Sequence, residues 1–295
     1  MEITKKKLKG LYLDQKLSSP TIGKIFHRDP VFIRRKLKKY NIPIRPLCEA
    51  LPLSNKSPYS QKNFRGDLKE KSYLIGFRLG DLNVRRISKT NFTITIQTNS
   101  TKTELIQLVR SLFLPYGQIR KTMPDKNGAI CIRCSLNRSF KFLLNKKDLI
   151  ESWILKNKYY FAAFLAGYTD AEGSFCLCRN KAVFNIRSQD KNIIHQIRTR
   201  LIELGILLRP PLLVRKRGTK DIKGVVSNKD VYGIWIHRKD AILKLINLIG
   251  PYLKHKDRLR RIKLIKNNII QRNKKYNNQS DRRFYKLYLK EGIKI

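Results

Sequence analysis

Residues 161–175 read FAAFLAGYTDAEGSF, an apolar run that ends in two acidic residues and a glycine. Its small residues Ala163, Gly167 and Ala171 recur at every fourth position. On a helix such residues form one stripe, where the backbone of a second helix can come close. Gly173 ends the helix, and a strand follows it. The stretch therefore predicts a tightly packed helix with carboxylates at its end.

A partner helix is predicted upstream, over residues 72–83, which read SYLIGFRLGDLN. This stretch has the same four-residue spacing of small residues, beginning at Ser72. Aligning the two stripes places Asp81 on Glu172, 91 residues later. A carboxylate at the end of a packed helix is well placed to bind a divalent cation. The residues expected at the helix contact are Gly76, Gly80, Gly167 and Ala171.

Both stretches resemble the motif of the LAGLIDADG homing endonucleases. LAGYTDAEG is a close match, whereas LIGFRLGDL has Leu79 in place of the first acid and Leu82 in place of the final glycine. The resemblance implies an α+β fold in which two pseudo-symmetric αββαββα half-domains form a DNA-binding saddle. It also implies that Asp81 and Glu172 are catalytic metal ligands for Mg²⁺, with Mn²⁺ as a substitute. Asp170 is expected to brace the helix ends.

The same resemblance nominates two further catalytic residues. Residues 250–256 read GPYLKHK, similar to a proline-aromatic-leucine-lysine run of the family, and this nominates Lys256. An ordinary surface lysine is an equal alternative. Gln97 is nominated as a polar residue at a strand end, with Ser188 or Gln189 as its counterpart in the second half.

An internal repeat supports two half-domains. After each motif acid the pattern reads two strands, a helix, two strands and a closing helix. Residues 92–98, FTITIQT, alternate apolar and polar side chains, so each sheet has one covered face and one face for a ligand. Polar strand residues of this kind can read base edges in the major groove. Those expected to face DNA are Arg85 or Arg86, Thr93, Thr95, Gln97, Asn185, Arg187, Arg215, Arg217 and His237.

Residues 1–46 hold 13 basic and 3 acidic residues and read as a separate helix-turn-helix module. Its third helix, predicted over residues 31–40, carries Arg34 and Arg35 toward DNA. The alternative is a basic bundle that contacts phosphates only. The expected divisions are a module over 1–46, a linker over 47–69, half-domains over 70–155 and 156–271, and a basic tail over 272–295.

The composition indicates a polyanionic partner. The 295-residue chain has 65 lysines and arginines against 21 acids, a formal charge of +44. No apolar run approaches a membrane span and no signal peptide is recognisable, so we expect a soluble, intracellular monomer in a bacterial cytoplasm or an organelle. The five cysteines form no regular framework and are expected to be structural thiols, with a zinc site as the alternative.

Three functions fit these observations. The favoured prediction is an intron-encoded homing endonuclease that recognises a long asymmetric double-stranded DNA site and cuts both strands. The second is a nuclease-inactive protein of the same fold, either a maturase that binds its host intron RNA or a transcription regulator that binds DNA. The third, a protein of anionic membranes or ribosome surfaces, explains the charge but neither motif. The retained pair Asp81 and Glu172 favours the nuclease.

Overall fold

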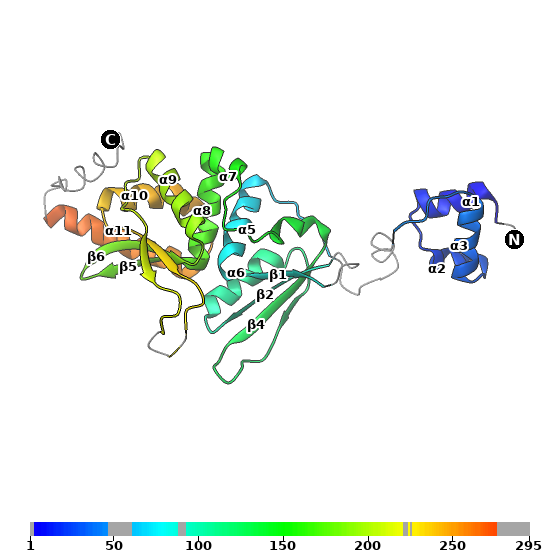
Figure 1. Cartoon of the computed structure of the whole chain (residues 1–295), viewed down its shortest axis with the longest axis horizontal. Coiled ribbons are helices and arrows are strands. Elements are labelled where there is room, and N and C mark those ends of the chain that lie inside the picture. The colour runs from blue at the N-terminus through cyan, green and yellow to red at the C-terminus, as the bar shows by residue number, and fades with distance from the viewer. Residues whose placement is uncertain (1–2, 47–60, 88–92, 221–223, 225, 276–295) are drawn as a thin grey trace.

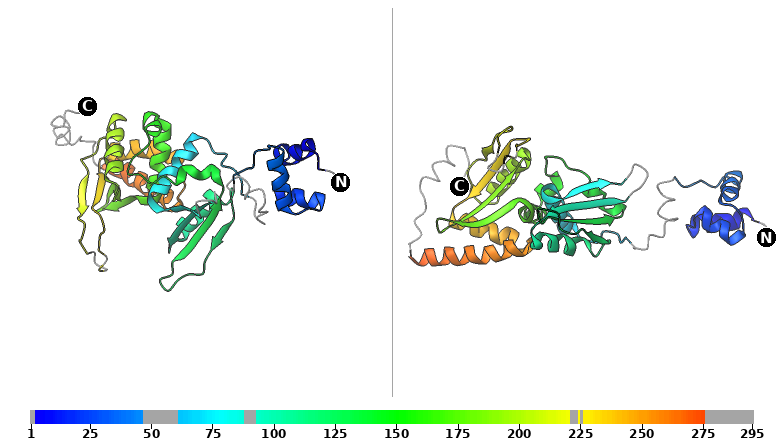
Figure 2. Two further views of the ribbon diagram at one scale, coloured as in Figure 1. Left: turned by 45° about the vertical axis from the view of Figure 1, so that its right-hand side comes forward. Right: turned by 90° about the horizontal axis from the view of Figure 1, so that it is seen from below.

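The computed structural model describes residues 3–46, 61–87, 93–220, 224 and 226–275. Two antiparallel four-stranded sheets, with helices packed on one side, make up the main body, and a small helical module lies at the N-terminal end (Figure 1). Most of the predicted linker and the basic tail beyond residue 275 fall outside the described residues. The sheets are seen from other directions in Figure 2.

The N-terminal module has a core of its own, formed by eight buried residues that include Ile22, Ile33 and Leu37. Ser18 caps the second helix and Asp29 caps the third. The turn between the two helices is short and spans residues 27–29. A Cβ at Gly23 would overlap the carbonyl oxygen of this turn, so only glycine allows the close approach. The elements are α1 (Lys5–Lys9), the π-helical turn η1 (Gly10–Asp14), α2 (Ser19–Phe26) and α3 (Pro30–Lys39).

The main body is built around two helices, α5 (Leu68–Asp81) and α8 (Lys158–Glu172). They cross with their backbones in direct contact. A Cβ at Gly76 would overlap the carbonyl oxygen of Phe164, and one at Gly167 would overlap that of Tyr73. The small-residue stripe of each helix therefore meets the main chain of the other.

Each motif helix leads into a sheet of the same topology. The strand orders are β1-β2-β4-β3 and β5-β6-β8-β7, with every pairing antiparallel. The first half continues with β1 (Asn83–Arg86), β2 (Ile94–Ser100), α6 (Thr103–Phe113), β3 (Ile119–Lys121), β4 (Ile130–Leu136) and the 3-10 helix η2 (Arg138–Leu143). The second half continues with β5 (Gly173–Cys178), β6 (Lys181–Ser188), α9 (Lys191–Glu203), β7 (Leu212–Arg215), β8 (Val231–Ile236), α10 (Lys239–Ile249), the 3-10 helix η3 (Gly250–Tyr252) and α11 (Lys256–Lys275).

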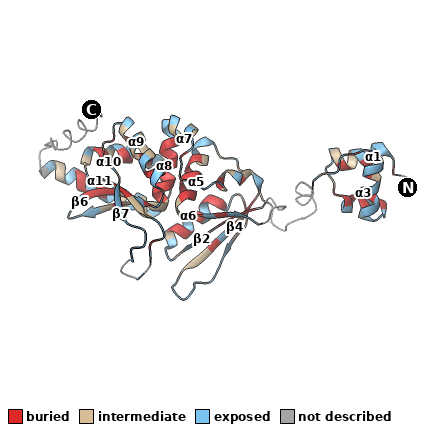
Figure 3. Cartoon of the chain, viewed as in Figure 1, coloured by how far each residue is buried: buried red, intermediate tan, exposed pale blue. Residues whose placement is uncertain are grey.

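A single hydrophobic core runs through both halves, between the helices and one face of each sheet (Figure 3). On β2, Ile94 and Ile96 point into it, and on β6 Phe184 and Ile186 do the same. The strand residues between them point to the opposite face, called here the open face. Cys134 lies in the core, and its thiol donates weakly to the carbonyl oxygen of a helix end 3.9 Å away. The predicted α+β fold with two αββαββα half-domains is confirmed.

Three local features differ from the sequence expectation. A short helix, α7 (Ser152–Lys156), precedes α8. Phe64, assigned to the linker, packs among the rings of Tyr116, Phe140 and Phe142, and its amide donates to a serine hydroxyl 2.8 Å away. Helix α11 continues past residue 271 to Lys275. The polar composition around both predicted boundaries gave no sign of the aromatic contacts of Phe64 or of the hydrogen bond between Lys239 and Asn273.

Among the described residues, no helix is both long enough and apolar enough to cross a bilayer.

Candidate active site and nucleic-acid surface

The two motif acids end the paired helices. Asp81 is the last residue of α5 and Glu172 the last residue of α8. Gly80 allows them to approach, because a Cβ there would stand 2.9 Å from the Cγ of Glu172 and would overlap Ala171. The residues predicted at the helix contact therefore all lie there. The same contact brings the two carboxylates close enough for the charge of Asp81 to act on Glu172.

Both carboxylates are half-buried, and both have raised pKa values. Burial raises the pKa of Asp81 to about 6, while Arg258 and Lys102 act in the opposite direction. Burial, together with the negative charges of Asp81 and Asp190, raises the pKa of Glu172 to about 7. Each acid therefore gives up its proton reluctantly in the free protein, and a cation beside the pair would relieve the cost.

The residues present fit a divalent cation only with help from outside the chain. Within the described part of the chain, no cluster of three or more His, Cys, Asp or Glu side chains is arranged as a metal site, and neither motif acid forms an ion pair. Two carboxylates with raised pKa values can supply one or two oxygen ligands each. Mg²⁺ typically takes few protein carboxylates and completes its sphere with water and phosphate oxygens. The pair Asp81 and Glu172 fits that mode of binding.

Asp170 has a different environment from the motif-end acids. Its Oδ2 atom accepts hydrogen bonds from the Tyr73 hydroxyl at 2.6 Å and from the backbone amides of Lys254 and His255 at 2.8 and 3.1 Å. The carboxyl is almost fully buried, and burial raises its pKa to about 6. Asp170 therefore ties α5 and α8 to the segment that opens α11.

The first half uses a different brace. Leu79 occupies the position that corresponds to Asp170, and the neighbouring Arg78 is buried instead. Its Nε donates to the carbonyl oxygen of Leu143 at 2.9 Å, and its Nη1 donates to that of Leu82. Arg78 thus ties the end of α5 to the last residue of η2. An arginine replaces the missing acid, with carbonyl groups in place of amides as partners.

We expect the substitution Asp170→Ala to destabilise the protein by about 2–4 kcal/mol. Three donors would lose their shared acceptor, and the hydrogen bonds of two of them, Tyr73 and His255, are buried. Asp170→Asn keeps one acceptor oxygen and should cost less than half as much. Urea unfolding followed by circular dichroism measures both. Equal stability of Asp170→Ala and the wild type would show that water replaces the carboxylate without penalty.

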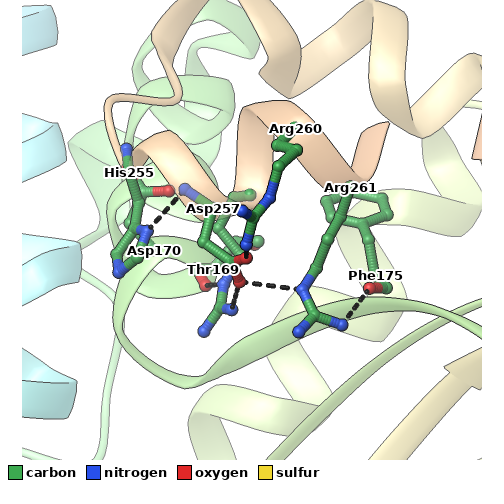
Figure 4. A network of polar contacts seen from close by, with 8 residues as sticks. Thr169, Asp170, Phe175, His255, Asp257, Arg260 and Arg261 are labelled. Carbon is green, nitrogen blue, oxygen red and sulfur yellow. Dashed lines mark hydrogen bonds and ion pairs between the residues drawn. The ribbon is translucent and has the colours of Figure 1, made fainter. Parts of the chain in front are cut away.

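The nominated lysine and the neighbouring arginine lie in different environments. Lys256 begins α11 and is exposed, whereas the side chain of Arg258 is only 13% exposed. Arg258 donates to the carbonyl oxygen of Thr169 at 3.5 Å and pairs with Asp257 at 3.2 Å. Asp257 also binds Arg260 and Arg261, at 2.6 and 2.8 Å (Figure 4). The positive charge whose field reaches Asp81 is thus Arg258 on the other half, in addition to Lys102.

The open face of the first sheet is polar along its length. Arg85 pairs across the strands with Thr95, so it shares that face, whereas Arg86 pairs with the core residue Ile94. Gln97 lies opposite Asn83, close to the motif acid, and its Oε1 accepts from the Arg133 guanidinium at 3.0 Å. Thr95 is buried within the sheet, and Thr93 lies just before β2. The residues exposed on this face are Asn83, Arg85, Asn99, Arg120 and Arg133.

The open face of the second sheet is mixed in character. Asn185 is half-buried there, and the exposed Arg187 lies over the Trp235 ring with its guanidinium 5.6 Å from the ring centroid. Arg215 ends β7 and is brought to this face by an irregularity between residues 213 and 215. Arg217 and His237 follow the ends of β7 and β8 and are exposed at the rim.

In the N-terminal module, Arg34 and Arg35 are exposed on α3, on the side away from the buried Ile33 and Leu37.

Several residues of this site were not identified from the sequence. Asp148, in the first half, accepts from the amides of Asn192 and Ile193 at 3.0 and 2.9 Å and so caps α9 of the second half. Asp190 lies near enough to Glu172 to raise its pKa. The sequence signal for Asp190 was its place directly before a predicted helix, where an acid commonly serves as the N-cap.

Neither a protein-family model nor a curated protein matches the chain. Solved structures do match it, at low sequence identity. The structural neighbours are LAGLIDADG homing endonucleases and the WhiA protein.

The homing endonuclease I-DmoI, in its mesophilic variants, is 19% identical over 62% of this chain and 95% of its own, with a TM-score of 0.42. The homing endonuclease I-WcaI, bound to its DNA recognition sequence, is 18% identical over 73% of this chain and 98% of its own, with a TM-score of 0.46. Full-length DUF199/WhiA from Thermatoga maritima is 16% identical over 79% of this chain and 69% of its own, with a TM-score of 0.49.

Proposed function

We propose that this chain is a monomeric, site-specific homing endonuclease that hydrolyses one phosphodiester in each strand of a long, asymmetric double-stranded DNA target. The observation that carries the proposal is the pair Asp81 and Glu172, which end two helices in backbone contact and have raised pKa values. Asp170, only two residues from Glu172, has three structural hydrogen bonds, whereas the motif-end acids have none among the described residues. We therefore assign the motif-end acids to metal binding and not to bracing the helices.

In this proposal Asp81 and Glu172 hold Mg²⁺, or Mn²⁺ in its place, which would activate a water and stabilise the departing 3′ oxygen when bound. The residues of the chain have the task of positioning. Gly76 and Gly167 fix the distance between the helices, and Gln97 and Arg258 present a polar group and a positive charge near Asp81. Lys256 is exposed at the start of α11, within the same segment, and is proposed to contact the attacked phosphate.

The proposed partner is double-stranded DNA, and charge supports it. The formal charge of +44 far exceeds what solubility requires, and both open faces carry arginines. An antiparallel ribbon fits the major groove, where polar side chains distinguish the base pairs. The N-terminal module would add a second contact through Arg34 and Arg35, which lengthens the recognised site.

A second candidate is a nuclease-inactive DNA- or RNA-binding protein of the same fold. It is favoured by the fixed cations around Asp81. Arg258 and Lys102 partly offset the rise in the pKa of that carboxyl caused by burial, as a bound metal would. The pKa of Glu172 is instead raised by the negative charges of Asp81 and Asp190, against which Lys146 acts. The two half-sites are thus electrostatically unequal. In this alternative, the half-site of Asp81 has protein cations in place of a metal.

The deciding experiment incubates the full-length protein with a randomised double-stranded DNA library, in Mg²⁺ and in EDTA, at moderate salt so that nonspecific binding is weak. A homing endonuclease enriches one sequence family among the cleaved ends in Mg²⁺ and leaves the library intact in EDTA. Enrichment of bound but never cleaved DNA, unchanged by Mn²⁺, would support the nuclease-inactive alternative. Preferential binding of structured RNA would support the maturase form of it.

Metal binding should strengthen as pH rises through 6 to 7. The carboxyls of Asp81 and Glu172, with pKa values of about 6 and 7, must lose protons before they can bind a cation. Below pH 6 the affinity for Mn²⁺ should fall by about tenfold per pH unit for each proton displaced. Titration of Mn²⁺ by electron paramagnetic resonance at pH 5.5, 6.5 and 8 measures this directly.

The same groups predict how stability depends on pH without metal. Because folding raises both pKa values, the contribution of these carboxyls to stability is present below pH 4 and is lost as pH rises through 6 to 7. Glu172→Gln should flatten this loss and remove the steepest part of the Mn²⁺ pH dependence. A pH-independent Mn²⁺ affinity would contradict the assignment of these two ligands.

A further inference from the structure

The two open faces differ at positions that correspond to one another. Gln97 lies opposite Asn83, two residues after the motif acid of the first half. Asn185 lies opposite Ser174, two residues after the motif acid of the second half. On the next strand, Gln97 faces Arg133, whereas Asn185 faces Trp235. An arginine in the first sheet is therefore replaced by a tryptophan in the second.

The indole ring of Trp235 reaches over Gly233 of its own strand. A Cβ at Gly233 would stand 2.5 Å from one atom of the indole ring and 3.0 Å from the Cγ2 of Val214, so the glycine makes room for both. On the other side, the guanidinium of Arg187 lies 5.6 Å from the ring centroid. The ring is thus held by its packing against Gly233 and Val214 and by the cation that lies over it. Such a side chain offers a rigid apolar surface.

Apolar neighbours enlarge this surface. Leu212 pairs with Gly233 across the strands and is 58% exposed, and Val214 is 39% exposed. The three side chains Leu212, Val214 and Trp235 form what we call the Trp235 patch. Arg187 and Arg215 flank it on the same face. The patch is an apolar centre within a basic rim, in which Leu212 and Val214 are exposed and Trp235 is half-buried.

The chemistry of the major groove identifies the occupant. Each base pair there presents hydrogen-bonding groups, and thymine alone adds an apolar group, its C5 methyl. The first sheet presents hydrogen-bonding side chains, including Gln97 and Arg133, that match adenine and guanine edges. The Trp235 patch has little to offer such edges but buries a methyl group well. The basic rim supplies contacts to the adjacent phosphates.

We propose that the Trp235 patch reads thymine methyl groups, so that the half-site under the second sheet is specified by methyl contacts and the half-site under the first sheet by hydrogen bonds. This proposal rests on the proposed function, because it requires that the open faces contact double-stranded DNA. It assigns Trp235 as a specificity-determining residue of that function.

The test begins with the target selected by the full-length wild type in EDTA, where the DNA stays intact. Deoxyuridine then replaces thymine, one half-site at a time, which removes only the methyl groups. Substitution under the second sheet should weaken binding about threefold to fourfold for each contacted methyl, the effect of exposing one apolar carbon. Substitution under the first sheet should leave the affinity unchanged. Footprints of Arg133→Ala and Trp235→Ala assign the two half-sites to their sheets.

A specificity exchange provides the sharper variant. Trp235→Arg copies the arginine of the first sheet, and selection with this variant should change the contacted base pair from T·A to G·C. Trp235→Leu keeps an apolar side chain and should keep the thymine preference with weaker binding. The unfolding midpoints of both variants, measured beside the wild type, identify any loss that arises from folding alone.

Fluorescence gives a readout that does not depend on selection. The chain has two tryptophans, and Trp153 lies on helix α7, where its indole donates to Glu151 at 2.6 Å. In a Trp153→Phe protein, emission comes from Trp235 alone, and specific DNA should change it strongly. The matched Trp235→Phe protein, which reports Trp153, should respond little.

The outcomes separate the two proposals. If no DNA sequence is selected, the proposed function fails and this inference fails with it. If a site is selected, but uracil has no effect in either half-site or the same effect in both, the inference is overturned while DNA recognition stands. Methyl dependence confined to the half-site under the second sheet, with the exchange seen for Trp235→Arg, supports it.

Discussion

Protein carrying Glu172→Gln should bind its DNA target and fail to break both strands. The amide is the same size but cannot supply a negative oxygen ligand, and cleavage of the strand it serves should fall on the order of a thousandfold or more. Asp81→Asn should act in the same way on the other strand. Each single variant should therefore nick one strand, and the two variants should nick opposite strands.

End-labelled duplexes resolved on denaturing gels measure these rates separately for each strand. Glu203→Gln is a suitable control, because Glu203 is exposed and pairs with Arg200 on its own helix. It removes one carboxylate without touching the helix ends, and it should cut at the wild-type rate. Full double-strand cleavage by both motif variants would remove the catalytic role from these acids.

The second large effect is expected at the helix contact. Alanine is favoured over glycine inside a helix by about 1 kcal/mol, so Gly167→Ala would stabilise an isolated helix. In the protein, the added Cβ would overlap the carbonyl oxygen of Tyr73, and the helices would have to separate. We expect a net destabilisation of about 1–3 kcal/mol, in the direction opposite to helix propensity. Combining it with Gly76→Ala, which meets Phe164, should abolish cooperative folding.

Gly250→Ala is the matched control in the same half. Gly250 has a right-handed backbone, and a Cβ there would lie 3.9 Å from its nearest neighbour, an ordinary contact. Its stability should equal or exceed that of the wild type. Urea unfolding compares all the variants, and a Gly167→Ala protein as stable as Gly250→Ala would mean that the helices tolerate wider spacing.

The fold was predictable because two kinds of local signal agree with each other. The small residues around Gly76 and Gly167 mark a helix contact, and the alternation of FTITIQT marks a sheet with one covered face. The internal repeat then fixes the order of the elements. The packing of Phe64 was not predictable, since it depends on aromatic partners that are distant in the sequence. Helix α7 was not predictable either, because its five residues are too few to show a helical period.

The candidate site was predictable only in part. The motif acids are recognisable from the sequence, but their electrostatic surroundings arise from the other half of the molecule. Arg258 lies 177 residues after Asp81 in the sequence yet influences its pKa, and Asp148 caps a helix of the opposite half. Nothing in the sequence around Arg78 indicates that its side chain is buried, except that Leu79 stands in place of an acid. Contacts that cross a pseudo-twofold axis have no local sequence signal.

The carbonyl contacts of Gly76 and Gly167 also have a consequence for engineering this protein. They set the separation of the two helix ends, and so of Asp81 and Glu172, without involving any side chain on the open faces. Under the proposed function, the base pairs that are read and the distance between the two cuts would therefore be controlled by different residues. A variant redesigned on its sheets to recognise another sequence should leave the same length of single-stranded overhang.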